Sequence, residues 1–272
     1  MHHHKLAFIG AGNMAKAIIG GLVRSGYPAE NIIAADPGNE NLQILSKEFN
    51  IQTSNDNQQA AQFAEVIILA VKPWIVPVVC QDIVDFVDQQ LIVSIAAGKT
   101  TSSIAQYLAS CGGIIRAMPN TPCLISKGMT GLFANTDVQQ KDRDFISNLF
   151  ENIGETTWLD DESQIDIITA LSGSGPAYYF YLTEALIKAG VELGLNEDVA
   201  TKLVTQTGLG SVAMLADQVE QTAARLRKAV TSPNGTTEAA ITVFDDNQLM
   251  DIISKAVQSA TARGHELSVE SK

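Results

Sequence analysis

The sequence predicts an α/β protein in two parts, a doubly wound parallel sheet in the N-terminal half and an all-helical C-terminal half. Up to about residue 161, short apolar segments alternate with helical stretches, which is the order of a parallel sheet covered by helices. From Glu162 the strand signals stop, and long helical patterns rich in Ala and Leu follow. We therefore expect two domains, residues 1–161 and residues 162–272.

Composition limits the classes of function. The chain has 272 residues, of which 46% are hydrophobic and 18% charged, so it can bury a sizeable core. A formal net charge of −12 argues against binding to nucleic acid or to an anionic membrane surface, since both attract clustered Lys and Arg. The apolar runs 66–71 and 91–98 are too short to span a bilayer and are typical of buried parallel strands.

The cysteines and the N-terminus indicate a cytoplasmic protein without a metal site. Three cysteines, Cys80, Cys111 and Cys123, are odd in number and lack metal-ligand spacing, so we expect reduced thiols. No signal peptide precedes the first predicted strand, and the polar start "MHHH" is interpreted as an expression remnant or a natural leader.

A glycine-rich turn in the first domain predicts a dinucleotide site. An apolar strand at residues 6–9 is followed by the sequence G-x-G-x-x-A and by a helix that ends near residues 25–26. Gly10 allows the tight turn, Gly12 lets the backbone approach a pyrophosphate, and Ala15 lets the helix pack closely on the strand. This arrangement predicts a Rossmann-type domain that binds a dinucleotide.

The second strand, residues 32–36, ends in an acidic residue with two interpretations. A carboxylate at the position of Asp36 commonly accepts the ribose hydroxyls of NAD and repels the additional phosphate of NADP. The sequence "DPGNEN" that begins there is also typical of a turn, in which Asp36 serves mainly as a turn former. Asp36 is therefore a candidate cofactor contact whose effect on cofactor choice is left open.

Further strands are expected near Ile51 and at residues 66–70, 91–95 and 114–117, separated by helices. In such a sheet the ligand lies at the carboxyl ends of the strands.

Three loops follow these strand ends. Lys72 and Lys99 lie in two of these loops, and an ordinary exposed lysine is the default for both. Lys72 is the better functional candidate, because it comes just past a central strand, where phosphates would lie. In "RAMPNTP", residues 116–122, two prolines stiffen the backbone and leave Asn120 and Thr121 as polar groups facing the same crevice.

The second domain begins with a helix, a glycine-rich interruption and a long apolar helix opened by Pro176. The apolar residues between Tyr178 and Ile187 are too many for one stripe, which predicts a helix buried on most sides, partly against a second chain.

The loop "VTSPNGTT", residues 230–237, places four hydroxyl residues around a Pro-Asn-Gly turn. It is either a helix corner capped by Thr236 or Thr237, or an anion site in which helix amides and hydroxyls hold a carboxylate.

Six motifs, in this order and spacing, resemble the pyrroline-5-carboxylate reductase family over essentially the whole chain: "FIGAGNMA", "AVKP", "SIAAG", "RAMPNTP", "LSGSGPAY" and "VTSPNGTT". The resemblance implies reduction of 1-pyrroline-5-carboxylate to L-proline with NADPH or NADH, the last step of proline synthesis. It also implies a helical domain that interlaces with a second subunit. Dimers of that family often assemble into larger rings, so a homodimer is expected, with a larger ring as a further expectation.

The resemblance also implies site residues by position. The cofactor is expected to contact Ile9, Gly10, Ala11, Gly12, Asn13, Met14, Asn57, Ala70, Val71, Lys72, Pro73, Ala96 and Ala97. The substrate is expected to contact Glu162, Ser232, Gly235, Thr236 and Thr237, with Thr237 hydrogen-bonded to the ring nitrogen as the catalytic candidate. Asn234 departs from the glycine usual in the family, which is tolerable because Asn adopts left-handed geometry.

Two alternatives are kept. A 3-hydroxyacid dehydrogenase resembles this organisation but carries a catalytic Lys four residues after the last Gly of its glycine-rich segment; here Tyr179 follows Gly175 at that distance, and the first Lys of the helix is Lys188. A non-catalytic dinucleotide-sensing protein would keep the glycine-rich turn and lose the 230–237 loop, which is intact.

Overall fold

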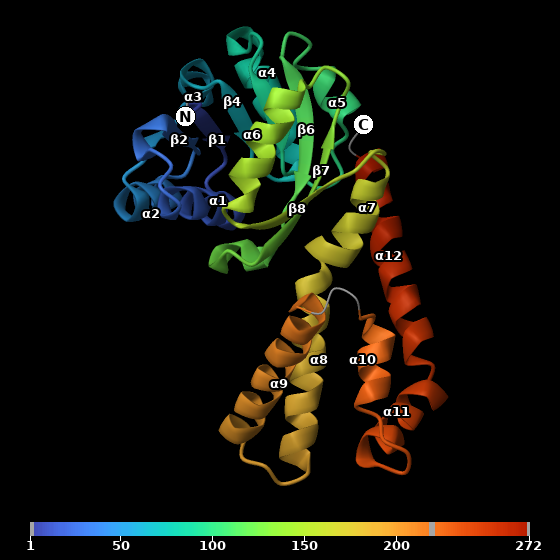
Figure 1. Cartoon of the computed structure of the whole chain (residues 1–272). Helices are drawn as coiled ribbons and strands as arrows, with labels where there is room; N and C mark the ends of the chain where they lie inside the picture. The colour runs from blue at the N-terminus through green and yellow to red at the C-terminus, as the bar shows by residue number, and fades with distance from the viewer. Residues whose placement is uncertain (1–2, 218–220, 271–272) are drawn as a thin grey trace. The chain divides into compact units, whose positions relative to one another are not determined.

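The computed structural model describes residues 3–217 and 221–270. The chain divides into two compact units, which are described separately: Met1–Pro176 together with Gln258–Lys272, and Ala177–Val257 (Figure 1). The domain boundary after residue 161 stays a prediction, because a division by compactness and a division by function need not coincide.

The first unit contains one eight-stranded sheet in the order β3-β2-β1-β4-β5-β6-β7-β8. All neighbouring strands run parallel except β6 and β7, which are antiparallel. The predicted parallel-dominated, Rossmann-like sheet is therefore confirmed. The strands are β1 (Leu6–Ile9), β2 (Ile32–Ala35), β3 (Gln52–Ser54), β4 (Val66–Leu69), β5 (Leu91–Ser94), β6 (Gly113–Met118), β7 (Gly128–Ala134) and β8 (Gly154–Trp158).

The sequence did not predict β7 and β8. Their sequences, "GMTGLFA" and "GETTW", contain glycine and threonine in place of a continuous apolar run. The edge strand β8 is only partly buried, so the apolar signal of a central strand is not required there.

Helices cover both faces of the sheet, and each face has its own core (Figure 1). Successive residues of a strand point to opposite faces, so Leu6 and Phe8 of β1 join one core while Ala7 and Ile9 join the other. The first core includes residues of α1 (Asn13–Arg24), α2 (Asn39–Phe49) and α6 (Gln140–Glu151), and the second includes residues of α3 (Asn57–Phe63), α4 (Val76–Ile83) and α5 (Thr101–Ala105).

The C-terminal part of the chain is helical, as predicted. A short α7 (Gln164–Ile168) continues through a π-helical turn, Thr169–Gly173, into the following long helix, which has Pro176 in its first turn. The remaining helices are α8 (Gly175–Glu192), α9 (Glu197–Asp217), α10 (Ala223–Ala229), α11 (Thr236–Asp246) and α12 (Leu249–Glu270).

The second unit has almost no core of its own. Among its described residues, 177–217 and 221–257, Ala200 is the only buried one. Large apolar side chains are exposed along its helices, including Phe180 at 68%, Tyr181 at 75% and Leu209 at 66%. A helical unit of this kind needs a further surface to cover it. None of the described helices is long and apolar enough to cross a membrane.

Candidate active site

The carboxyl ends of the parallel strands lie in one row. Ile9 pairs with Ala35 on one side and with Leu69 on the other, and Leu69 pairs with Ser94. The residues that follow continue this pairing, since the N–H of Gly10 donates to the Ala35 carbonyl and that of Ala70 to the Ile9 carbonyl. Residues 9–14, 36, 70–73 and 96–97 therefore meet at one edge of the sheet, which is where a ligand of such a sheet lies.

The glycine-rich turn has the geometry that a pyrophosphate site needs. Gly10 has a φ of +106°, and a Cβ there would lie 2.5 Å from the Ala70 carbonyl oxygen, so only glycine fits. Gly12 is the N-cap of α1, and a Cβ added to it would meet no atom within 4 Å, so the space above the helix end is open. The first intrahelical bond runs from the Lys16 N–H to the Gly12 carbonyl, so the preceding amides of α1 are free to meet an anion.

Asp36 is bound to the glycine-rich turn. One carboxylate oxygen accepts from the Ala11 N–H at 2.9 Å and the other from the Gly38 N–H at 2.8 Å. The bond to Gly38 is the one expected of a turn former. The bond to Ala11 fixes a negative charge beside the turn, so the two interpretations of this residue are compatible.

The lysines of the next two loops differ in exposure. Lys72 is exposed, which fits both an ordinary loop lysine and a phosphate contact, so its contact with the cofactor stays a prediction. Lys99 is 4% exposed, so the expectation of an ordinary exposed lysine is wrong for this residue. Burial lowers the pKa of its ammonium group, an effect partly offset by the nearby Cys80.

Asn57 and Asn120, both predicted to contact the cofactor, already have protein partners. The Asn57 amide donates to Asp82 at 2.9 Å. Asn120 is buried, and it donates to the carbonyl and hydroxyl oxygens of Ser172 while accepting from the Met129 N–H. These bonds join β7 to the turn before α8, and a role for either residue in cofactor binding stays a prediction.

Glu162 belongs to a cluster that the sequence did not reveal. Its carboxylate accepts from the Thr101 N–H at 2.7 Å, the Thr101 hydroxyl at 2.9 Å and Arg116 Nη1 at 3.0 Å. Arg116 Nη2 lies 3.9 Å from Asp166. The available signal was Arg116 itself, a charge inside the apolar strand "GIIRAM", because a buried Arg requires an acidic partner.

The 230–237 loop, in the helical unit, leads into α11. Gly235 is the N-cap and has no side chain with which to cap the helix. The alternative in which Thr236 or Thr237 caps the helix is therefore wrong, because they are its first two residues. Asn234 has a φ of +58°, which confirms the left-handed geometry expected of it.

Among the described residues, hydrogen bonding in this loop leaves several donors without a partner. The Gly235 N–H already donates to the Ser232 carbonyl, and the Glu238 carboxylate accepts from the Asn234 N–H at 2.7 Å. Within the described part of the chain, the hydroxyls of Ser232, Thr236 and Thr237 have no partner. The first intrahelical bond of α11 runs from the Ala239 N–H to the Gly235 carbonyl, so the amides available to an anion are those of Thr236, Thr237 and Glu238, while Gly235 contributes the shape of the turn.

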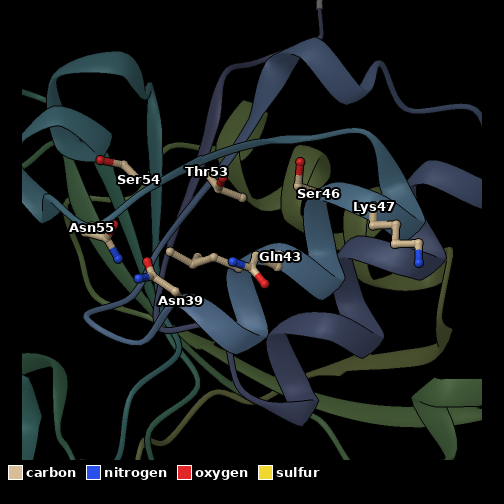
Figure 2. Close-up of a pocket in the computed structure, with 8 residues that line it drawn as sticks. Asn39, Gln43, Ser46, Lys47, Thr53, Ser54 and Asn55 are labelled. Carbon is tan, nitrogen blue, oxygen red and sulfur yellow. The ribbon is translucent and has the colours of Figure 1, made fainter.

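A separate groove of 430 Å³ lies between α2 and the edge strand β3 (Figure 2). It is lined by Asn39, Leu42, Gln43, Ser46, Lys47, Thr53, Ser54 and Asn55. None of the predicted cofactor or substrate residues lines this groove, so it is distinct from the glycine-rich turn.

Comparison with known proteins connects these features. A model of the pyrroline-5-carboxylate reductase dimerisation family matches residues 162–267, and a model described as NADP oxidoreductase coenzyme F420-dependent matches residues 5–98. The pyrroline-5-carboxylate reductase of Pseudomonas aeruginosa is 45% identical over 266 residues, which cover 97% of both chains. This chain belongs to the pyrroline-5-carboxylate reductase family.

Other members of the family agree over the same length. The pyrroline-5-carboxylate reductase of Vibrio alginolyticus is 42% identical over 98% of both chains. The solved structure of a pyrroline-5-carboxylate reductase from Coxiella burnetii matches with a TM-score of 0.92 at 39% identity, covering 98% of this chain and 99% of that one. The structure from Plasmodium falciparum, with NADP bound, has a TM-score of 0.89 at 29% identity, covering 98% and 99%. Neither the dehydrogenase nor the sensing alternative is favoured by these relatives.

Proposed function

We propose that this chain reduces 1-pyrroline-5-carboxylate to L-proline with a hydride from NADPH or NADH, the last step of proline biosynthesis. The observation that carries the proposal is similarity to pyrroline-5-carboxylate reductases at 42% to 45% identity over nearly the full length of both chains. The glycine-rich turn and the loop before α11 supply the two kinds of anion site that this reaction needs.

The proposed cofactor site is the carboxyl edge of the sheet. The amides at the start of α1, above the open face of Gly12, would hold the pyrophosphate. The segments 70–73 and 96–97 follow adjacent strands and would contact the rest of the dinucleotide. The nicotinamide, when bound, supplies the hydride.

The proposed substrate site is the loop before α11. The amides of Thr236 and Thr237 begin a helix of 11 residues, whose positive end favours a carboxylate. The free hydroxyls of Ser232 and Thr236 can complete the shell around the carboxylate oxygens, and Gly235 forms the turn that presents them.

Thr237 is proposed to hydrogen-bond the ring nitrogen of the imine. Hydride adds to C5, the π electrons of the C=N bond move to the nitrogen, and the proton already on that nitrogen stays there as the amine forms. Because a protonated imine is already electrophilic, no strong catalytic acid is required, and alignment supplies most of the acceleration.

The enzyme is proposed to be a homodimer formed through the helical unit. The match to a dimerisation family and the exposed apolar helices support association. A larger ring and a cytoplasmic location stay predictions, the latter based on the three free cysteines.

Deuterium transfer tests the proposal. Purified protein is supplied with the imine and with NADPH deuterated at the transferring C4 position. We expect L-proline carrying one deuterium at C5. Proline without the label, or no proline with either NADPH or NADH, would contradict the proposed reaction.

A further inference from the structure

The three hydrogen bonds of Glu162 all return to the nucleotide-binding unit. Oε1 accepts from the Thr101 N–H and from Arg116 Nη1, and Oε2 accepts from the Thr101 hydroxyl. The Glu162 side chain is 22% exposed and that of Arg116 is 4% exposed. The carboxylate is therefore largely buried and oriented by partners from two different elements.

These partners fix the two ends of one loop. Residues 95–100 connect β5 to α5, and Thr101 is the first residue of α5. At the other end, Ser94 is the last residue of β5 and pairs directly with Arg116 of β6. Glu162 thus connects the two ends of this loop. Thr101 directly follows the loop, and Arg116 is the strand partner of Ser94, the residue that precedes the loop.

The loop between these ends is the proposed contact of the cofactor. It contains Ala96 and Ala97 and includes Gly98 with a φ of +72°. Since the loop lies at the carboxyl edge of the sheet, a shift of Thr101 would move backbone that faces the cofactor.

Arg116 depends on Glu162 for its hydrogen bonding. Within the described residues, its Nη2 is buried and donates no hydrogen bond, and the nearest acid to it is Asp166 at 3.9 Å. Asp166 in turn lies 3.9 Å from His265 of α12. Removing Glu162 would leave a buried guanidinium with no close acceptor, which should destabilise the protein.

We propose that Glu162 and Arg116 are positioning residues, which hold the 95–100 loop in its cofactor-binding shape through Thr101. This inference rests on the proposed function, because it assumes that the loop binds NADPH or NADH. The expectation that Glu162 contacts the substrate stays a separate prediction, which the imine kinetics below distinguish from this role.

Cofactor titration tests the proposal without any substrate. NADPH and NADH are titrated separately onto wild type, Thr101→Val and Glu162→Gln by calorimetry. Thr101→Val removes one hydroxyl donor and keeps the backbone bond, so we expect about threefold to tenfold weaker cofactor binding. Thr101→Ser keeps the hydroxyl and should bind as wild type does.

Thr130→Val is the matched control, because Thr130 is a buried threonine of β7 outside the loop. It should leave the cofactor Kd unchanged. The titrations are followed by imine kinetics at saturating cofactor, where the KM for the imine should stay within twofold of wild type in Thr101→Val and in Glu162→Gln.

Three results would overturn the proposal. The first is a cofactor Kd within twofold of wild type in both Thr101→Val and Glu162→Gln. This holds also if the melting temperature of both variants falls, because their role would then be structural. The second is an increase in the imine KM alone in Glu162→Gln, which would indicate a substrate contact. The third is equal weakening by Thr130→Val. If wild type binds cofactor but makes no proline, the proposed reaction fails while the titrations still decide this inference.

Discussion

The carboxylate of Asp36 accepts a hydrogen bond from the backbone N–H of Ala11 at 2.9 Å, so the end of β2 is tied to the middle of the glycine-rich turn. A residue considered for cofactor choice therefore also supports the loop on which the cofactor would lie. A substitution at Asp36 changes both the charge near the cofactor and the hydrogen bond to the glycine-rich turn, so variants are needed that distinguish the two effects.

Asp36→Asn makes that separation. Asparagine keeps a side-chain oxygen for one backbone amide and removes the charge, whereas Asp36→Ser removes both. We expect kcat/KM with NADPH relative to NADH to rise about fivefold in both variants, which corresponds to roughly 1 kcal/mol between two charges in water. The melting temperature should fall more in Asp36→Ser. If the ratio of kcat/KM with NADPH to kcat/KM with NADH is unchanged in Asp36→Asn, Asp36 acts only as a turn residue.

Gly12→Val tests where the pyrophosphate lies. The position of an added Cβ is open, so the variant should fold normally and lose only the space that the cofactor would occupy. We expect the cofactor KM to rise roughly tenfold or more, since hydrogen bonds to charged groups are worth about 1.5–3 kcal/mol. Gly12→Ala should give a smaller rise. Unchanged cofactor kinetics in folded Gly12→Val would refute this placement.

Thr237→Ala tests the contact with the ring nitrogen. Because Thr237 does not cap α11, the melting temperature should change little. Loss of one neutral hydrogen bond, worth about 0.5–1.5 kcal/mol, should lower kcat/KM for the imine roughly threefold to tenfold, and misalignment of the imine could extend this to about a hundredfold. Thr237→Ser should retain activity.

Thr242→Ala is the control for this substitution. Thr242 lies on the same helix, and its hydroxyl donates to the Glu238 carbonyl. Imine kinetics that decline equally in Thr242→Ala and Thr237→Ala would indicate a general effect on α11. Unchanged kinetics in Thr237→Ala would exclude the proposed contact.

The helical unit should hold the protein together as a dimer. Phe180 of α8 is 68% exposed in the single chain, and Phe180→Glu would place a charge in the apolar surface proposed as the interface. We expect dimers at micromolar concentration by light scattering for wild type and dissociation or loss of folding for this variant. Trp74→Glu, at a residue 70% exposed in the other unit, should remain dimeric. A wild-type protein that is monomeric at this concentration and fully active would rule out the proposed dimer.

Much of the nucleotide-binding half could be predicted from the sequence, because its signals are local. Gly10 and Gly12 have the geometry assigned to them, and the central strands are continuous apolar runs. By contrast, β7 and β8 pair with distant segments and contain glycine and threonine, so they have no strong local pattern.

The site was predicted less completely because partners that are distant in sequence decide the role of each side chain. Glu162 meets Thr101 and Arg116 across 61 and 46 positions, and no spacing rule connects them. The polar N-terminal sequence "MHHH" did not predict contacts with the rest of the chain. In the structure, the His3 carbonyl accepts a hydrogen bond from the Asn31 side chain, and the His4 carbonyl accepts one from the Tyr27 hydroxyl. Met1 and His2 lie outside the described residues.

Product formation tests the central claim most directly. Purified protein is incubated with 1-pyrroline-5-carboxylate and either NADPH or NADH, while cofactor oxidation and L-proline are measured on the same sample. We expect one L-proline for each cofactor oxidised, and a much lower rate at limiting cofactor for Gly12→Val. Cofactor binding by wild type, with no proline above background from either cofactor, would contradict the proposed reaction.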